Sequence, residues 1–232
     1  MQSSPTQGSL NRPPDILWMD ELLRQGNISL SEKSLQQLWS YHQLLRSHNQ
    51  DRDLTRITGF ESMVVKHYID CLLVGNLLEL SGPLLDIGTG AGFPGIPLKI
   101  AFPQLDIILA EHRPKRVAFL KKAIQTLNLQ KIGIFSKKVI PESFHTPVTM
   151  VISRALEDIG KTLQRIEPFL QAQGKVIFMK GPSVDTEIEF LHEHPEQFNG
   201  YRLAEDLSYD LPIIGHNRRL VVYEKMILEE VE

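Results

Sequence analysis

Hydrophobic and polar residues follow two different rhythms along this chain, and the rhythms meet near residue 83. Over residues 16–80, apolar side chains recur every three or four positions, the spacing that lines one face of an α-helix. After Pro83, short apolar runs alternate with longer helical stretches, which is typical of strand–helix–strand units in a parallel sheet. We therefore predict a helical region over residues 15–82 and an α/β region over residues 83–232.

Seven apolar runs of the second region have the length and composition of strands. They are Leu84–Ile87, Asp106–Ala110, Ile132–Phe135, Val148–Ile152, Lys175–Met179, Tyr201–Leu207 and Arg219–Tyr223. Helices are expected to begin near Pro94, Pro114, Pro141 and Asp158, with one more around Val184–His194. Proline is tolerated in the first turn of a helix, because the N–H that it lacks would have no partner there. The pattern predicts a seven-stranded, mostly parallel sheet with the last strand inserted antiparallel, helices on both faces, and the N-terminal helices packed against it as a cap.

Composition places the chain among ordinary globular proteins. Its 232 residues, 42% of them hydrophobic, can bury a full α/β core, and the Ser- and Pro-rich residues 1–14 are expected to form a flexible lead. No apolar run approaches the ~20 residues of a membrane helix, and the start lacks the pattern of a signal peptide. Cys71 is the single cysteine, which excludes an internal disulfide and a thiolate zinc site. We expect a cytoplasmic protein with no membrane partner and no metal.

The net charge of −3 does not by itself favour a nucleic-acid partner. The charge is uneven, however, because residues 112–122 carry five Lys or Arg side chains and one His without a single acid. This segment is either a local basic patch or the solvated face of a helix, and the charge pattern alone leaves both interpretations open.

A glycine-rich turn follows the first predicted strand, where residues 86–95 read DIGTGAGFPG. Gly88 and Gly90 let the backbone itself approach a ligand at the carboxyl edge of the sheet. Glu111 closes the second strand about twenty residues later, where a carboxylate accepts hydrogen bonds from both hydroxyls of an adenosine ribose. The arrangement indicates a cofactor that contains a nucleoside.

The same turn contains a G-x-G-x-x-G string, so a nicotinamide dinucleotide has to be weighed against S-adenosylmethionine. A dinucleotide sets its pyrophosphate on the helix N-terminus, where the carboxylate of Asp86 would repel it. S-adenosylmethionine carries an ammonium and a sulfonium, which a carboxylate attracts. The charge favours S-adenosylmethionine and the Rossmann-like class I methyltransferase fold, although both folds place an acid at the position of Glu111.

The extended loop LLDIGTGAGFPGIPL, residues 84–98, resembles the hallmark of the glucose-inhibited division protein B family. Three further stretches match that family in order: Asp53–Thr55 with Lys66–Asp70, Lys115–Arg116 with Phe119–Leu120, and Ile152–Ala155. The resemblance covers about residues 16–225, and the FPGIP extension together with the SRA element is more specific than the glycine loop alone. It implies an enzyme that transfers a methyl group from S-adenosylmethionine to N7 of a guanine in 16S ribosomal RNA.

The candidate cofactor-binding residues come from the loop argument and from the resemblance together. They are Asp86, Gly88, Gly90, Phe93, Glu111, Val139, Ile140 and Arg154. Ile140 stands where the family usually has an acid, so an adenine contact there must come from the backbone and from aliphatic packing. Lys138 stands where arginine is expected, which keeps the charge but loses the planar fork that grips phosphate.

Guanine N7 carries a lone pair and no proton, so we name no catalytic base. N7 faces the deep groove of A-form RNA, which means that the guanine must be unpaired or flipped out. Arg154 is expected at the cofactor cleft, where it assists by binding phosphate, stacking on a base or ordering the donor; a salt bridge to Asp86 or Glu111 is the alternative. The candidate RNA-binding residues are Lys115, Arg116, Lys138, Lys180 and Arg218.

His67 and Asp70 lie three residues apart, on one face of a predicted helix. We expect them to form a buried hydrogen-bonded pair that ties the helical region to the sheet. Trp18, Trp39 and Phe60 are expected in the core rather than on a platform for stacking bases.

Other functions stay open at this point. The alternatives are a methyltransferase that acts on a small molecule or protein, a dinucleotide-binding oxidoreductase, and a non-catalytic RNA-binding module. The expected partner is small-subunit ribosomal RNA, free or within a ribosomal particle, and the protein is expected to act as a monomer. The sequence does not indicate which guanine is modified.

Overall fold

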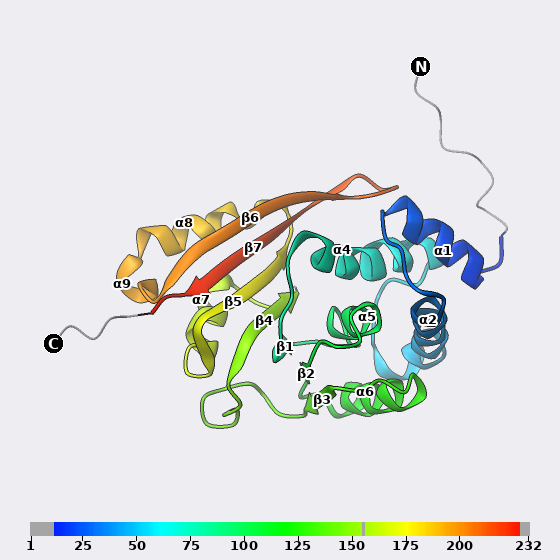
Figure 1. Cartoon of the computed structure of the whole chain (residues 1–232), viewed down its shortest axis with the longest axis horizontal. Helices are drawn as coiled ribbons and strands as arrows, with labels where there is room; N and C mark the ends of the chain where they lie inside the picture. The colour runs from blue at the N-terminus through cyan, green and yellow to red at the C-terminus, as the bar shows by residue number, and fades with distance from the viewer. Residues whose placement is uncertain (1–11, 155, 228–232) are drawn as a thin grey trace, which may run out of the picture.

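A seven-stranded sheet forms the centre of the protein (Figure 1). The computed structural model describes residues 12–154 and 156–227. The strands are β1 (Leu84–Ile87), β2 (Ile107–Ala110), β3 (Ile132–Phe135), β4 (Val148–Arg154), β5 (Leu170–Lys180), β6 (Tyr201–Leu211) and β7 (His216–Lys225). They lie in the order β3-β2-β1-β4-β5-β7-β6, with β1 to β5 parallel and β7 antiparallel to both of its neighbours. The prediction of a mostly parallel sheet with the last strand inserted antiparallel is confirmed.

The strand order reverses beside β1, which pairs with β2 on one side and with β4 on the other. In an open parallel sheet, such a switch point leaves a crevice at the carboxyl ends of the strands, because the following connections leave to opposite sides. The carboxyl ends of β1, β2 and β4 are therefore the place where the topology favours a ligand site.

The helical region packs on one face of the sheet. It comprises α1 (Ile16–Gln25), α2 (Glu32–Arg52), α3 (Phe60–Met63), the π-helical segment η1 (Val64–Ile69) and α4 (Asp70–Leu77). The side chain of Asp15 caps α1 by accepting from Trp18 N, and Ser31 caps α2 by accepting from Ser34 N. Figure 1 shows α2, α4, α5 (Gly95–Ala101) and α6 (Pro114–Thr126) grouped on this side, with α7 (Ile159–Ile166), α8 (Asp185–Glu193) and α9 (Pro195–Phe198) on the opposite side of the sheet.

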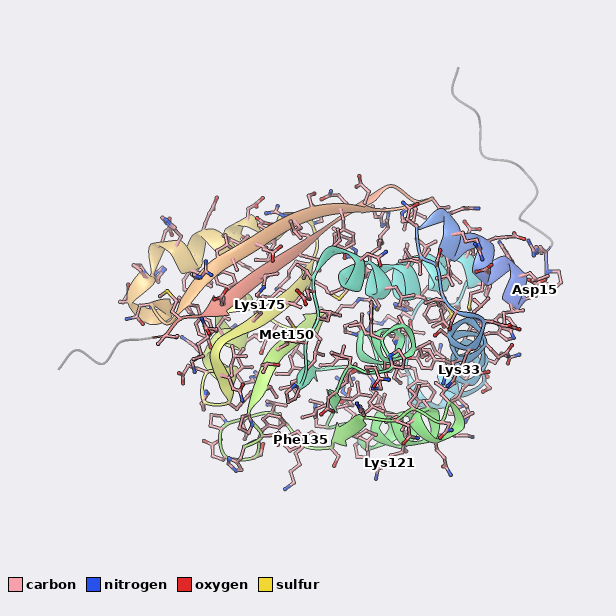
Figure 2. All side chains as sticks on the ribbon, in the orientation of Figure 1. Asp15, Lys33, Lys121, Phe135, Met150 and Lys175 are labelled. Atoms are coloured by element: carbon pink, nitrogen blue, oxygen red, sulfur yellow. The ribbon has the colours of Figure 1, made fainter. Side chains whose placement is uncertain are left out.

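Two hydrophobic cores cover the two faces of the sheet, because successive side chains of a strand point to opposite faces. Leu84 and Ile177 belong to the core shared with the helical region, and their neighbours Leu85 and Phe178 belong to the core shared with α7. Side chains fill the space between the sheet and its helices throughout Figure 2, in which Met150 of β4 and its register partner Lys175 of β5 are labelled.

The three aromatic residues predicted for the core pack against it while remaining half-buried. Trp18, Trp39 and Phe60 all border the core of the helical region, and the ring centroids of Trp18 and Phe60 are 4.8 Å apart. No helix within the described residues combines the length and the apolar content needed to cross a lipid bilayer.

The predicted helix near Pro141 is wrong. Residues 141–143 form a single turn, in which the carbonyl of Ile140 accepts from the amides of Ser143 and Phe144. The segment between β3 and β4 has prolines at positions 141 and 147 and buries one large side chain, Phe144, so it lacks the apolar face that stabilises a longer helix. The flexible lead predicted for residues 1–14 lies outside the described residues up to position 11, and Arg12 bonds to Glu21 at 2.6 Å.

Candidate cofactor site at the carboxyl edge of the sheet

The glycine loop after β1 adopts a backbone that favours glycine. Gly88, Gly90 and Gly92 have φ angles of +74°, +62° and +107°. A Cβ on Gly92 would lie 2.5 Å from Ile96, whereas a Cβ on Gly90 would find no other heavy atom nearer than 3.7 Å. The loop is therefore tightly packed on the side of α5 and open at Gly90, where a ligand has room to approach the backbone.

Asp86, at the end of β1, holds this loop from inside. Its Oδ2 accepts from Thr89 Oγ1 at 2.6 Å and from the amide of Gly95 at 2.8 Å, and the residue is fully buried. Its Oδ1 is buried without a hydrogen-bond partner among the described residues. Burial raises the pKa of this carboxyl to about 7, against the lowering effect of the two hydrogen bonds. A buried acceptor with no partner is costly, so the carboxyl group is suited to meeting a cationic ligand.

Glu111, directly after β2, lies next to the loop. The carbonyl of Ala110 accepts from the amides of Gly88 and Thr89, at 3.0 and 3.2 Å, which joins the ends of β1 and β2. Glu111 is 5% exposed, and its Oε1 accepts from the amide of Arg113 at 2.8 Å. The carboxylate is thus fixed at the site with acceptor capacity to spare, since each oxygen has two lone pairs.

Arg154, the last residue of β4, is anchored in the helical region. Its Nη2 donates to the carbonyl of Lys66 at 2.6 Å and pairs with Asp70 Oδ2 at 3.3 Å, and its Nη1 lies 3.7 Å from the sulfur of Cys71. The alternative of a salt bridge to Asp86 or Glu111 is wrong, because the acid within ion-pair distance is Asp70. The guanidinium carbon lies 5.8 Å from the ring centroid of Phe93, within cation–π range.

His67 stacks on the ring of Phe93, with the centroids 4.5 Å apart and the planes at 19°. Its Nδ1 lies 3.2 Å from Arg154 Nη2 and its Nε2 lies 2.7 Å from Thr55 Oγ1. Burial, followed by the charge of Arg154, lowers the pKa of His67 to about 3. The ring is therefore neutral, with Nδ1 accepting from the guanidinium and Nε2 donating to the threonine.

Asp70 joins four elements through its buried carboxylate. Tyr209 of β6 donates to Oδ1 at 2.8 Å, Arg218 of β7 places its Nε 3.7 Å from the same oxygen, and Arg154 of β4 pairs with Oδ2. The predicted hydrogen bond between His67 and Asp70 is wrong, since each makes its contacts with other groups and they meet through Arg154. Sequence reasoning noted Thr55 within a family stretch but gave it no role, and it missed Tyr209, which stands in no motif.

The remaining predicted cofactor-binding residues differ in how far they are buried. Val139 is buried in the core beside α7, while Ile140 is 36% exposed. Leu156, which sequence reasoning also missed, packs over the loop, because a Cβ on Gly88 would lie 2.6 Å from it. The hydrophobic side chain is 38% exposed there.

Some of the candidate RNA-binding residues form ion pairs or hydrogen bonds with neighbouring residues. Arg116 lies 3.6 Å from Glu111 and donates to the carbonyl of Asp53 at 3.0 Å, and Lys180 bonds to Glu187 at 2.7 Å. Lys138 and Lys115 are exposed. Arg218 faces Asp70, so it lies against the Arg154 network rather than on an open surface.

The chain resembles known proteins over most of its length. A family model described as rRNA small subunit methyltransferase G matches residues 34–204. A protein of Syntrophobacter fumaroxidans named "Ribosomal RNA small subunit methyltransferase G 2" is 49% identical over 90% of this chain, which spans 41% of the length of that relative. A protein of the same name from Bdellovibrio bacteriovorus is 40% identical over 85% of this chain and 76% of its own length.

Solved structures agree with the fold. A crystal structure of a methyltransferase from Pyrococcus furiosus superposes with a TM-score of 0.57 over 82% of this chain and 98% of its own, at 15% sequence identity. At that identity the likeness shows the class I methyltransferase fold alone. The match of the family model to most of the chain, and a relative 40% identical over 85% of the chain and 76% of its own length, show that the chain belongs to the rRNA small subunit methyltransferase G family.

Proposed function

We propose that this protein transfers a methyl group from S-adenosylmethionine to N7 of a guanine in 16S ribosomal RNA. The proposal rests on one observation in a chain of this family: the glycine loop encloses the unpartnered Oδ1 of Asp86 and has Glu111 beside it. Relatives named as small-subunit ribosomal RNA methyltransferases support the RNA as acceptor.

Charge supports the assignment of the donor. Asp86 is an acid that the ammonium and the sulfonium of S-adenosylmethionine would favour, and Glu111 has lone pairs free to accept hydrogen bonds from ribose hydroxyls. The open side of Gly90 supports close backbone contact, and Ile140 and Leu156 offer exposed aliphatic surface for the adenosine. The bound donor supplies an electrophilic methyl group on a sulfonium, and the residues around it have to hold and align the two reactants.

The state of the surrounding groups supports an acceptor atom that bears no proton. His67 is neutral, has a pKa of about 3, and has both ring nitrogens engaged. Cys71 is buried, and burial raises the pKa of its thiol far above neutrality. Neither group is placed to act as a general base, and guanine N7 requires none.

Transfer of tritiated methyl from S-adenosylmethionine to unmethylated small-subunit particles tests the proposal. Glu111→Gln should raise the donor KM about tenfold, because a neutral acceptor makes weaker hydrogen bonds to the ribose by about 1.4 kcal/mol. Glu79→Gln is the matched control, an exposed acid just before β1, at the opposite edge of the sheet. Donor binding without any transfer to the particles would refute the RNA acceptor, and equal donor KM values for both variants would refute the role of Glu111.

A further inference from the structure

Three segments far apart in the sequence meet beside the glycine loop and carry basic side chains. Arg116 of α6 donates to the carbonyl of Asp53, Arg46 of α2 donates to the carbonyl of Thr58, and Lys122 of α6 contacts His48 Nε2 at 2.9 Å. These contacts hold the end of α2, residues 53–58 and the first turns of α6 on one surface. We call this surface the basic ridge, and its cations are Arg46, Arg56, Arg113, Lys115, Arg116 and Lys122.

The charge of the ridge is opposite to that of the whole chain. Residues 46–58 and 112–122 together contain eight Lys or Arg residues against two Asp residues, Asp51 and Asp53, whereas the chain carries a net charge of −3. Among the described residues, no acid lies within ion-pair distance of Arg46, Arg56, Arg113 or Lys122. On the far side of the site, by contrast, Arg219 is neutralised by Asp185 and Asp206, and Lys180 by Glu187.

The ridge reaches the candidate cofactor site at its inner end. A Cβ on Gly90 would lie 3.7 Å from Arg116 Nη1, and the same guanidinium lies 3.6 Å from Glu111. The segment that carries Arg56 is tied to the site as well, because Thr55 Oγ1 meets His67 Nε2 at 2.7 Å and His67 meets Arg154. A strand of RNA lying on the ridge would therefore end at the open face of the glycine loop.

We propose that the basic ridge binds the phosphate backbone of the acceptor RNA and directs one nucleotide toward the glycine loop. This inference rests on the proposed function and adds α2 and residues 53–58 of the helical region to the RNA-binding surface. Phosphate contacts from Lys and Arg position a nucleic acid without reading its sequence, and each contact releases counterions. The helical region thus has a role in substrate binding in addition to its role in the core.

The test compares two triple variants that remove the same charge. Arg46→Gln, Arg56→Gln and Lys122→Gln remove three of the six cations of the ridge without touching the residues around the loop. Lys33→Gln, Lys131→Gln and Lys175→Gln are the control. Lys33 lies in the first turn of α2 beside Ser34, whose Oγ donates to the carbonyl of Ile100 near the end of α5. Lys131 directly precedes β3, and Lys175 lies within β5 opposite Met150, so all three are away from the loop. Lys33 and Lys175 are labelled in Figure 2, as is Lys121 on α6.

Binding of transcribed small-subunit ribosomal RNA is measured from 50 to 200 mM salt, together with the RNA KM for methyl transfer. The ridge variant should raise the RNA KM about tenfold and reduce the slope of log K against log salt by about 2, since each lost contact to single-stranded phosphate contributes about 0.7. The control variant should have the RNA KM and salt slope of the unsubstituted protein, and both variants should keep its affinity for the donor. A charge-preserving variant, Arg46→Lys, Arg56→Lys and Lys122→Arg, should restore binding, which separates lost charge from damaged folding.

Two results would overturn the inference in different ways. If the unsubstituted protein methylates RNA and the ridge and control variants have the same salt slope, the ridge is not the docking surface and the proposed function survives. If the unsubstituted protein binds the donor but neither binds the transcribed RNA nor methylates that RNA or small-subunit particles, both proposals fail.

Discussion

Asp70→Asn should destabilise the fold by about 3 kcal/mol, because it leaves the buried guanidinium of Arg154 without a compensating charge. Removing one partner of a buried ion pair costs about 3–5 kcal/mol. The lower end applies here, since the side chain of Arg154 is 15% exposed and that of Asp70 2% exposed. Asparagine can still accept the hydrogen bond from Tyr209, so the loss of stability reports the missing charge rather than a missing hydrogen bond.

Urea unfolding followed by circular dichroism measures this loss, and about 3 kcal/mol corresponds to a fall in Tm of roughly 6–12 °C for a chain of this size. Glu224→Gln is the matched control, because its ion pair with Arg202 at 2.9 Å joins the antiparallel strands β6 and β7 with the arginine 59% exposed. Such a surface pair contributes about 0–1 kcal/mol. Equal losses in the two variants would refute the idea that the Asp70 carboxylate compensates a buried charge.

Three further predictions concern the loop and its surroundings. Asp86 has a pKa of about 7 in the fold against 3.8 as the ordinary value, so its favourable contribution is complete below about pH 3.8 and is lost as the pH rises toward 7. The free energy of unfolding of Asp86→Asn, relative to that of the unsubstituted protein, should therefore rise by up to about 4 kcal/mol from pH 4 to pH 8 in urea titrations without donor. A difference between the two proteins that does not change with pH would contradict this. Gly95→Ala should lower Tm by roughly 4–8 °C through overpacking of about 2 kcal/mol, because its Cβ would lie 2.3 Å from Leu109, whereas Gly133→Ala, with nothing within 4 Å, should not lower it. Cys71 should react with a thiol reagent at pH 8 only after denaturation, because it is buried and burial raises its pKa; rapid labelling of the folded protein would contradict the packing.

The central strands of the sheet were predictable because they are buried on both faces. All four residues of β1 are buried, and the strand is a short apolar run apart from Asp86, as is typical of parallel sheets. The position of Glu111 beside the glycine loop followed from the same reasoning, since consecutive parallel strands end at one edge. The prediction of a helix near Pro141 failed because proline is as common in turns as at the start of a helix.

The partners of Arg154 could not be read from the sequence. Asp70 belongs to the helical region, and Tyr209, which also binds it, is 139 residues away on an antiparallel strand. Spacing along one helix placed His67 and Asp70 together, but it could not show that a guanidinium from β4 lies between them. Which cations are free of acidic partners likewise depends on the packing of distant segments.

The central claim is that a guanine of small-subunit ribosomal RNA receives the methyl group at N7. The direct test is digestion of the labelled RNA to nucleosides after transfer from tritiated S-adenosylmethionine, followed by chromatographic identification of the labelled nucleoside. The account predicts that the label is recovered in N7-methylguanosine and that Glu111→Gln reduces it at limiting donor. Label in any other nucleoside, or in protein, would contradict it.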